Sequence, residues 1–213
     1  MTNHHSPLLS EQLRPKTMQD ILLPEQDIAR LQNMITNHKL PNLLFYGSPG
    51  RGKTSAARIL QHQLDADIYE LNGSSISSDR ALEKEITSIA QSTTIMLKPK
   101  ILLIDEADYL HNRIQNSMRH IVENSSTKCR FILTANDERR IIPALKSRLT
   151  AVNFDLPISE TKTMLERLRT TMLRKLDKLN VNYDSERVFE IICLHYPDLR
   201  SIANKIEYEF STK

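Results

Sequence analysis

Short apolar runs alternate along the chain with segments of helical periodicity. The five apolar runs lie at positions 43–46, 68–71, 101–104, 131–134 and 151–154. Apolar residues recur at helical spacing in the intervening segments 55–64, 79–91 and 114–124. A strand that is apolar at nearly every position is typical of a parallel sheet whose two faces are both covered by helices. The pattern therefore predicts an α/β fold with a five-stranded parallel sheet of buried strands.

Pro157 marks a change of pattern, after which only helical periodicity remains. Segments 159–179, 185–196 and 199–210 are predicted to be helices. In the first of them Met164, Leu168 and Met172 belong to one apolar stripe, which is the ordinary way for a helix to join a core. We therefore predict two domains, an α/β domain over residues 1–157 and a small three-helix domain over residues 158–213.

Composition and charge limit the cellular compartment and the kinds of partner that we expect, but they do not indicate a function. Cys129 and Cys193 lie far apart and match no zinc-ligand spacing, which favours a reducing compartment without a disulfide framework. The N-terminus carries no signal-peptide pattern, and no apolar run approaches the length that spans a bilayer. We therefore expect a cytoplasmic protein, or a nuclear or nucleoid one, that is not secreted and has no membrane partner. The formal net charge of +3 is compatible with a polyanionic partner but falls short of a dedicated DNA-binding domain.

Three of the four glycines of the chain fall within six positions, directly after the first predicted strand. The stretch follows the pattern G-x-x-x-x-G-K-[ST] and precedes a predicted helix, which is the context of a phosphate-binding loop. In such a loop backbone N–H groups surround a phosphate, the lysine reaches the β- and γ-phosphates, and the hydroxyl binds Mg²⁺. The alternative is a glycine-rich turn that serves only as a tight connection. The predicted ATP-binding residues are Gly47, Ser48, Pro49, Gly50, Arg51, Gly52, Lys53, Thr54 and Ser55, with Thr54 also on the metal.

The third predicted strand ends in two adjacent carboxylates, Asp105 and Glu106. Carboxylates at the end of a buried strand carry a desolvation cost unless a cation lies nearby, and Mg²⁺ supplies one. We predict that Asp105 holds Mg²⁺ directly or through water, and that Glu106 orients and deprotonates the attacking water. The alternative is a pair of acids that cap the following helix.

The chain resembles the AAA+ clamp-loader subunits, in particular the small subunits of replication factor C and the ATPase subunit of the phage clamp loader. The resemblance covers nearly the whole chain and rests on motifs that follow one another in the order of the family. These motifs are residues 11–15 (EQLRP), 40–47 (LPNLLFYG), 70–74 (ELNGS), the acidic strand, 132–136 (ILTAN), 145–148 (LKSR) and 197–200 (PDLR). The resemblance implies an AAA+ P-loop domain followed by a helical lid domain.

Three further catalytic residues are implied by the resemblance. Asn136 corresponds to the first sensor, a polar group between the γ-phosphate and the water, and the alternative is a turn-forming asparagine. Arg148 corresponds to the arginine finger that reaches into the site of the neighbouring subunit, although Leu149 stands where the motif of the family has a cysteine. Arg200 corresponds to the second sensor on the lid helix, and the alternative is a solvated surface arginine.

The resemblance also implies residues that line the base and the DNA. Arg14 and Pro15 fall in the segment that lines the adenine pocket in the family, where a lysine and a tyrosine are replaced here by the residues at positions 12 and 13. The helices after the second and third strands track the DNA backbone in the family, which would place Arg80, Asn112 and Arg113 near phosphates. The alternative for these three residues is a solvated helix start, since exposed polar residues are ordinary.

The function implied by the resemblance is that of an assembly-dependent ATPase with ATP and Mg²⁺ as cofactors. Its expected partners are other AAA+ subunits, identical or different, a sliding clamp, and primed or duplex DNA. In the family a third helical domain, the collar, follows the lid and holds the subunits together, whereas this sequence ends at Lys213, so that the chain is either truncated or a natural collarless relative. The second hypothesis is a collarless AAA+ switch or adaptor whose nucleotide state controls another protein or DNA complex.

Overall fold

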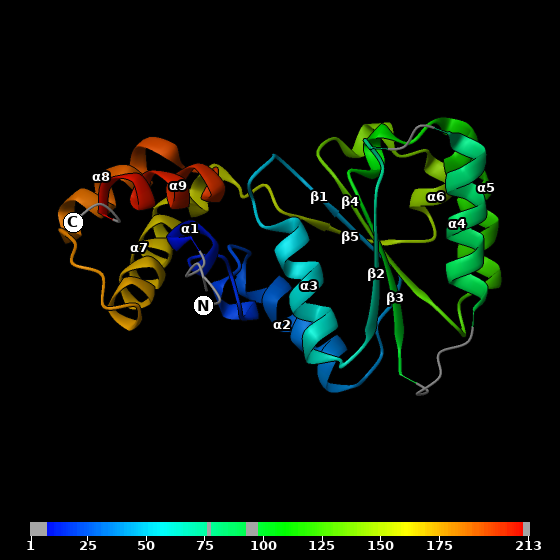
Figure 1. Cartoon of the computed structure of the whole chain (residues 1–213), viewed down its shortest axis with the longest axis horizontal. Helices are drawn as coiled ribbons and strands as arrows, with labels where there is room; N and C mark the ends of the chain where they lie inside the picture. The colour runs from blue at the N-terminus through cyan, green and yellow to red at the C-terminus, as the bar shows by residue number, and fades with distance from the viewer. Residues whose placement is uncertain (1–7, 76–77, 93–97, 211–213) are drawn as a thin grey trace, which may run out of the picture. The chain divides into compact units, whose positions relative to one another are not determined.

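The computed structural model describes residues 8–75, 78–92 and 98–210 (Figure 1). Its internal contacts group the chain into two compact units. The helical unit comprises the N-terminal residues through Leu22, the loop tip Pro49–Gly52, and Leu156–Lys213. The sheet unit comprises Leu23–Ser48 and Lys53–Asp155. The two predicted domains, divided after residue 157, stay a prediction about folding, because contacts alone do not report which segments fold independently.

The described residues of the sheet unit contain one parallel sheet of five strands. The strands are β1 (Leu43–Tyr46), β2 (Asp67–Asn72), β3 (Lys100–Asp105), β4 (Arg130–Ala135) and β5 (Thr150–Asn153). They are ordered β2-β3-β4-β1-β5, and every neighbouring pair is parallel. The predicted five-stranded parallel α/β architecture is confirmed. In parallel pairing all the carboxyl ends point the same way, so the residues that follow β1, β3 and β4 meet at one edge.

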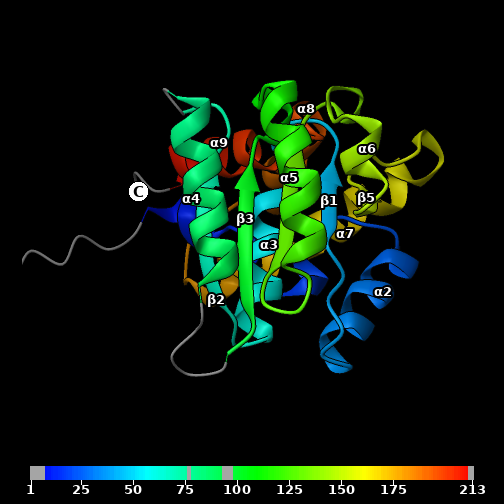
Figure 2. The same ribbon diagram turned by 90° about the vertical axis from the view of Figure 1, so that its right-hand side faces the viewer.

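Helices cover both faces of this sheet. The helices of the unit are α2 (Glu25–Thr36), α3 (Lys53–Gln63), α4 (Asp79–Gln91), α5 (Asn112–Asn124) and α6 (Pro143–Lys146), with the short 3-10 helices η2 (Ala107–Tyr109) and η3 (Glu138–Arg140). Helices α2 and α3 lie on one face of the sheet, and α4 and α5 lie on the other (Figures 1 and 2). The hydrophobic pattern predicts α3, α4 and α5 but not α2, so α2 is an addition from the structure.

Alternate residues of the central strands pack toward α4 and α5. Leu102 and Ile104 of β3, together with Phe131 and Leu133 of β4, belong to one buried cluster. The period of two is that of a strand, in which successive side chains point to opposite faces. The cluster is completed from α4 and α5 by Leu82, Ile86, Ala90, Ile114, Met118 and Val122. The central strands are therefore buried on both faces, as predicted.

The prediction that all five strands are buried is wrong for β2 and β5. These two strands form the edges of the sheet. Tyr69 and Glu70 of β2 are exposed, and so are Thr150 and Ala151 of β5. An edge strand has a neighbour on one side only, and its hydrophobic pattern does not reveal that position, because strand order is decided by the tertiary fold.

The described residues of the helical unit form three longer helices and several short ones. Its elements are α1 (Leu9–Gln12), η1 (Met18–Asp20), η4 (Ile158–Glu160), α7 (Thr161–Lys178), α8 (Ser185–His195) and α9 (Leu199–Phe210). Met164, Leu168 and Met172 are buried in its core with Leu13, so the predicted stripe is confirmed as packing. In the part of the chain that the structure describes, no helix is both long and apolar enough to cross a membrane.

A buried ion pair fastens the N-terminal segment of the helical unit to α7. Lys175 donates hydrogen bonds of 2.9 Å to the carbonyl oxygens of Leu13 and Arg14. Asp20 lies 3.4 Å from the Lys175 ammonium and accepts hydrogen bonds from the N–H groups of Lys16 (3.0 Å) and Thr17 (3.3 Å). Cation and carboxylate therefore satisfy the carbonyl and amide groups of the same short segment, as buried polar groups require.

Candidate active site

The predicted phosphate loop leaves β1 at Gly47 and enters α3 at Lys53. The Gly47 N–H donates to the carbonyl oxygen of Ala135 at 3.2 Å, and the Ser48 N–H donates to Asp155 Oδ1 at 2.9 Å. Gly47 has a φ of +137°, and a Cβ on it would lie 2.9 Å from the backbone nitrogen of Asp155. Glycine is required at this position, because both the backbone conformation and the space exclude a side chain.

Lys53 lies at the centre of this loop with only 7% of its surface exposed. Its ammonium donates to the carbonyl oxygens of Gly47 at 2.6 Å and Ser48 at 2.9 Å, and to Asn136 Oδ1 at 2.9 Å. Asn136 follows β4, so one cation joins the start of the loop to the end of a neighbouring strand. The two residues predicted to act on the γ-phosphate are therefore brought into direct contact.

Thr54 and Asp105 form the second contact of the site. The Thr54 hydroxyl lies 2.9 Å and 3.1 Å from the two carboxylate oxygens of Asp105, which is the last residue of β3. Thr134 of β4 donates its own hydroxyl to Asp105 Oδ1. Hydroxyl and carboxylate oxygens are the ligands that Mg²⁺ prefers, so the pair fits the predicted metal position.

Glu106 follows with an unusual backbone. It has a left-handed φ of +56°, which is uncommon for a residue with a side chain. Its N–H donates to Thr134 Oγ1 at 3.0 Å, so the same hydroxyl holds both acidic residues. A Cβ on Gly73, beyond the end of β2, would lie 2.5 Å from the carbonyl oxygen of Glu106. The position of the candidate base therefore depends on a hydroxyl from β4 and on the absence of a side chain after β2.

The tip of the phosphate loop belongs by its contacts to the helical unit. Gly50 and Gly52 have left-handed φ values of +74° and +87°. The Leu199 N–H donates to the carbonyl oxygen of Gly50 at 3.1 Å. Pro49 lies in the same tip, whereas Ser55 lies half-buried in the first turn of α3. The phosphate-binding role of these residues stays a prediction.

Arg148, the predicted arginine finger, is held within its own chain. Its Nε donates to Glu123 Oε1 at 2.7 Å, and its Nη1 donates to the carbonyl oxygen of Ala144 at 2.5 Å. Glu123 lies in the last turn of α5, so the arginine bridges α5 and α6 within the sheet unit. A role in a neighbouring subunit stays a prediction, and it requires the guanidinium to exchange Glu123 for a phosphate.

Arg200 lies in the first turn of α9, and its side chain is exposed. The Arg200 and Ser201 N–H groups donate to Asp198 Oδ1 at 2.9 Å and 3.2 Å. Asp198 thus caps the helix that carries the predicted second sensor. Because Leu199 of the same turn contacts the loop tip, α9 and the loop tip are neighbours within the helical unit.

The segment predicted to line the adenine pocket is ordered by α7. The carbonyl oxygen of Arg14 accepts from Lys175, while the Arg14 side chain is exposed and Pro15 is half-buried. Ile21, six residues beyond this segment, would have its Cδ1 3.7 Å from a Cβ on Gly52. The chain that follows the segment therefore reaches the tip of the phosphate loop within the same unit, and the contact of Arg14 and Pro15 with a base stays a prediction.

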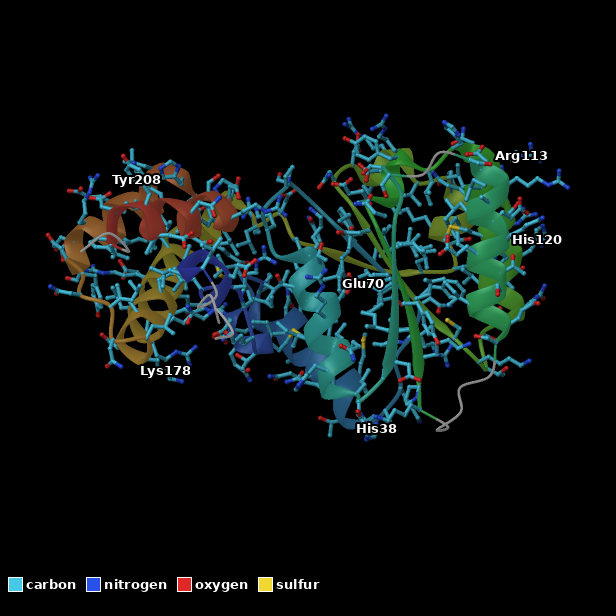
Figure 3. The ribbon with its side chains drawn as sticks, viewed as in Figure 1. His38, Glu70, Arg113, His120, Lys178 and Tyr208 are labelled. Atoms are coloured by element: carbon cyan, nitrogen blue, oxygen red, sulfur yellow. The ribbon has the colours of Figure 1, made fainter. Side chains whose placement is uncertain are left out.

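The residues predicted to face DNA come from two neighbouring helix starts. Arg80 lies in the first turn of α4, and Asn112 and Arg113 lie in the first turn of α5; all three are exposed. His111 Nδ1 lies 2.9 Å from Asp79 Oδ1, which joins the two helix starts. Arg113 and His120 project outward from α5 (Figure 3). Exposure is required for DNA contact but is equally expected of a solvated surface.

Several residues of the candidate site were not predicted from the sequence. The contacts of Thr134, Asp155 and Gly73 are with residues far away in the sequence, so no local pattern identifies these three as site residues. A weak signal exists for each. Thr134 is a polar residue inside an apolar strand, Asp155 is an acid two residues beyond the end of β5, and Gly73 is the only glycine outside the phosphate loop.

A family model matches over half of the chain. The model described as "ATPase family associated with various cellular activities (AAA)" matches residues 43–156. This range begins with β1, contains every strand of the sheet, and includes Lys53, Asp105 and Asn136. The match therefore covers the part of the site that lies in the sheet unit.

Curated relatives are similar over nearly all of the chain. The probable replication factor C subunit 5 of Dictyostelium discoideum is 32% identical, over 92% of this chain and 57% of the relative. The sliding-clamp-loader large subunit of Escherichia phage RB69 is 29% identical, over 99% and 67%. The replication factor C small subunit of Methanococcus maripaludis is 32% identical, over 92% and 62%. The chain thus spans about three fifths of the length of these relatives.

Solved structures also resemble this chain. The Holliday junction branch migration motor RuvB of Thermotoga maritima superposes with a TM-score of 0.67 at 19% identity, over 92% of this chain and 64% of that one. A variant form of the same protein gives a TM-score of 0.70 at 18% identity, over the same shares of the two chains. At such low identity the likeness shows the fold alone.

Proposed function

The chain belongs to the AAA family of ATPases, and we propose that it binds and hydrolyses ATP with Mg²⁺ as a subunit of a clamp-loader assembly. In this proposal ATP turnover is coupled to the loading of a sliding clamp onto primed DNA during replication. Family membership supports the ATPase part of the proposal. The names of the relatives, replication factor C subunits and a sliding-clamp-loader subunit, support the clamp-loader part.

The observation that carries the proposal is the convergence of Lys53, Thr54 and Asp105 at the carboxyl ends of β1 and β3. The Lys53 ammonium is fixed on the loop carbonyls, and the next residue points its hydroxyl at the carboxylate of Asp105. The Lys53 ammonium, which can bind phosphates, thus lies beside the Thr54 and Asp105 oxygens, which can bind a metal ion. Such an arrangement suits a nucleoside triphosphate with its metal ion.

Binding in this proposal is shared between backbone and side chains. The backbone N–H groups of the loop, with the start of α3, surround the phosphates because a helix N-terminus favours an anion. Lys53 reaches the β- and γ-phosphates. Thr54 and Asp105 would hold Mg²⁺, directly or through water, and the bound ion would neutralise the charge that develops on the phosphates.

Hydrolysis is assigned to Glu106 and Asn136. Glu106 accepts a proton from the water whose oxygen attacks the γ-phosphorus, so that ADP and phosphate are formed. Asn136 lies within hydrogen-bond distance of Lys53 and orients that water beside the γ-phosphate. Thr134 holds the backbone of Glu106 and the carboxylate of Asp105 together, which keeps base and metal ligand in a fixed relation.

Two arginines complete the proposed reaction. Arg148 is supplied to the site of a neighbouring subunit, where its charge stabilises the transition state. Arg200 acts on the phosphates of its own chain from the start of α9. The partners proposed on this basis are other AAA+ subunits, a sliding clamp, and primed or duplex DNA, with Arg80, Asn112 and Arg113 on the DNA backbone.

The proposal is tested by the ATPase rate of the wild-type chain and of Lys53→Ala, each alone and with primed DNA plus a sliding clamp. We expect the wild-type rate to rise only when DNA and clamp are both present, and Lys53→Ala to lose ATP binding. An ATPase rate that is unchanged by DNA and clamp would contradict clamp loading and favour the switch or adaptor hypothesis. ATP affinity that is unchanged in Lys53→Ala would overturn the phosphate-loop assignment itself.

A further inference from the structure

The tip of the phosphate loop is seated on the turn between α8 and α9. The Leu199 N–H donates to the carbonyl oxygen of Gly50, and a Cβ on Gly50 would overlap the Asp198 carboxylate. A Cβ on Gly52 would lie 3.9 Å from Leu199 Cδ1. All of these residues belong to the helical unit, so the contacts lie within one body. The loop tip is therefore packed against this turn at each of its two glycines.

Arg51, between those two glycines, directs its side chain at the same turn. Its guanidinium carbon lies 5.2 Å from the centroid of the Tyr196 ring, and its Nη1 lies 3.3 Å from the Tyr196 hydroxyl. Only 8% of Arg51 is exposed. A guanidinium over a tyrosine ring is attracted by the negative face of the ring, and more strongly when water is excluded. The side chain of this loop residue therefore contacts both the ring and the hydroxyl of Tyr196.

The hydrogen bond from Leu199 fixes the orientation of one peptide of the loop. A trans peptide points its C=O and its N–H in opposite directions. Because the carbonyl of Gly50 points at Leu199, the N–H of Arg51 points away from α9. This N–H lies in the part of the loop where backbone donors surround a phosphate. The α8–α9 turn thus aims a phosphate-binding amide.

The first turn of α9 is fully engaged in this seating and in its own cap. Leu199 N–H is used by Gly50, and the next two N–H groups are used by the side chain of Asp198. The Ile202 N–H donates to the carbonyl oxygen of Asp198 at 3.1 Å. Each of the first four backbone amides of the helix therefore has a partner in the described structure, so these amides hold the loop tip and the helix cap and do not bind an anion.

We propose that Arg51 and Tyr196 are positioning residues that hold the phosphate-loop tip in its anion-binding conformation. Affinity for the triphosphate then depends on a ring that lies outside the loop sequence. The inference rests on the proposed function, since it concerns the same ATP site. It goes beyond the phosphate-loop pattern, in which position 51 is unspecified.

The test measures the affinities of Mg²⁺-ATP and of inorganic tripolyphosphate by calorimetry for wild type, Arg51→Met, Tyr196→Leu, Tyr196→Phe and the Arg51→Met/Tyr196→Leu double variant. Loss of a desolvated cation–π contact is worth roughly tenfold in an equilibrium constant. We expect Arg51→Met and Tyr196→Leu each to weaken both ligands by about that factor. Tyr196→Phe keeps the ring and should stay within about threefold of wild type. The double variant should be no weaker than either single variant, because the two residues act as one unit.

Matched controls separate positioning from general damage to the helical unit. Arg169 stacks on Phe189 at 4.7 Å elsewhere in the same unit, so Arg169→Met removes a similar contact away from the loop. Tyr208 is 76% exposed on α9, and Tyr208→Leu removes a tyrosine without touching the tip (Figure 3). Both controls should bind ATP and tripolyphosphate as wild type does. Unfolding midpoints of all variants identify any that fail to fold, and Tyr196→Met then replaces Tyr196→Leu.

Distinct results overturn the inference and the proposed function. If wild type binds ATP and Tyr196→Leu binds ATP and tripolyphosphate as tightly as wild type does, Tyr196 does not position the phosphate loop. The same conclusion follows if Tyr196→Leu weakens the binding of ATP but not that of tripolyphosphate. An additive, roughly hundredfold loss in the double variant means that Arg51 and Tyr196 act separately, which also rejects the inference. If wild type binds neither ligand, the proposed ATP site fails and the inference fails with it.

Discussion

The ammonium of Lys53 donates a 2.9 Å hydrogen bond to Asn136 Oδ1. This contact joins the first residue of α3 to the residue after β4, and the same ammonium also holds two carbonyl oxygens of the loop. A side chain that is already ordered loses little conformational freedom when a ligand arrives. We infer that Lys53 and Asn136, the two residues proposed to act at the γ-phosphate, are preorganised as a pair.

Glu106→Gln should separate binding from hydrolysis. The substitution keeps the size of the side chain and removes the group that accepts the proton from water. ATP affinity should therefore stay near that of wild type, while turnover falls by about 10²-fold or more, the usual contribution of a general base. Binding is measured by calorimetry and turnover by phosphate release. Turnover equal to that of wild type would mean that the Glu106 carboxylate is not the general base.

Arg148→Ala should bind ATP almost normally and fail to hydrolyse it within an assembly. An arginine supplied to a neighbouring site acts on the transition state, and its loss can cost on the order of 10³-fold in turnover. Mixing Arg148→Ala with Lys53→Ala should restore part of the activity, because some interfaces then pair an intact loop with an intact arginine. Phosphate release by the mixture is the measurement.

Glu123→Gln is the matched control for this experiment, since it removes the negative charge that pairs with Arg148 and leaves the arginine in place. It should bind ATP as wild type does. Mixed variants that assemble but never complement one another would show that Arg148 does not act in trans.

Arg80→Ala and Arg113→Ala should each reduce the salt dependence of DNA binding. The log–log slope of affinity against salt should fall by about one for each phosphate contact that is lost. The measurement is a titration of duplex DNA at several salt concentrations. Arg30 lies on α2, on the opposite face of the sheet, and its side chain is 70% exposed, so Arg30→Ala is the control. Slopes that stay at the wild-type value in both test variants would mean that Arg80 and Arg113 are ordinary solvated residues that do not contact DNA phosphates.

Asp20 should make the stability of the helical unit depend on acid. Burial tends to raise the pKa of Asp20, but the N–H groups of Lys16 and Thr17 and the charge of Lys175 outweigh it and hold the pKa below its ordinary value of 3.8. A folded-state pKa below the unfolded one gives stability that is present above the unfolded pKa, near 4. That stability is lost as the pH falls through the lower folded value.

Asp20→Asn should therefore be destabilised by about 3 kcal/mol at pH 7, as expected when one partner of a buried ion pair is removed. It should also lose less stability than wild type on acidification. Urea unfolding followed by circular dichroism measures both effects. Glu186 pairs with Arg169 while staying 75% exposed, so Glu186→Gln should change stability by less than about 1 kcal/mol. Equal acid sensitivity of wild type and Asp20→Asn would contradict the assignment.

The two cysteines should differ sharply in reactivity. Burial raises the pKa of the Cys129 thiol to about 11, whereas Cys193 is exposed on α8. The thiolate is the reactive form, so iodoacetamide at pH 8 should label Cys193 in the native protein and Cys129 only after denaturation. Mass spectrometry of wild type and Cys193→Ser gives the count of labelled thiols. Native labelling of Cys129 at the rate of Cys193 would mean that the start of β4 opens in solution.

The sequence predicts those parts of the fold that are decided within a short stretch of chain. Strand β1 and helices α4 and α9 have the predicted bounds, because each carries its own complete apolar pattern. The burial of β2 and β5 was not predictable in this way, since it depends on which strands become neighbours. Helix α2 buries Ile28 and Leu31 and also carries Ile35 at helical spacing, so an apolar stripe is present in its sequence although no helix was predicted there.

The residues of the candidate site likewise differ in whether a local sequence pattern identifies them. Lys53, Thr54, Asp105 and Glu106 are predicted from local pattern, because a loop after one strand and acids after another are visible in one dimension. Asn136, Arg148 and Arg200 depend on the resemblance, since a single polar residue at a strand or helix end has ordinary explanations. Tyr196 is more distant still. Its ring meets Arg51 across 145 residues, and only the folded chain places them together.

Gly73 adds a constraint that comes from a missing atom. Its α-carbon carries no substituent to collide with the Glu106 carbonyl, and that carbonyl belongs to a residue held in a left-handed turn. The backbone position of Glu106 therefore depends partly on the absence of a side chain at residue 73, in the connection that follows β2. Gly73 is remote from Asp105 and Glu106 in sequence and has no reactive group, yet any larger residue there would push the Glu106 backbone out of its place.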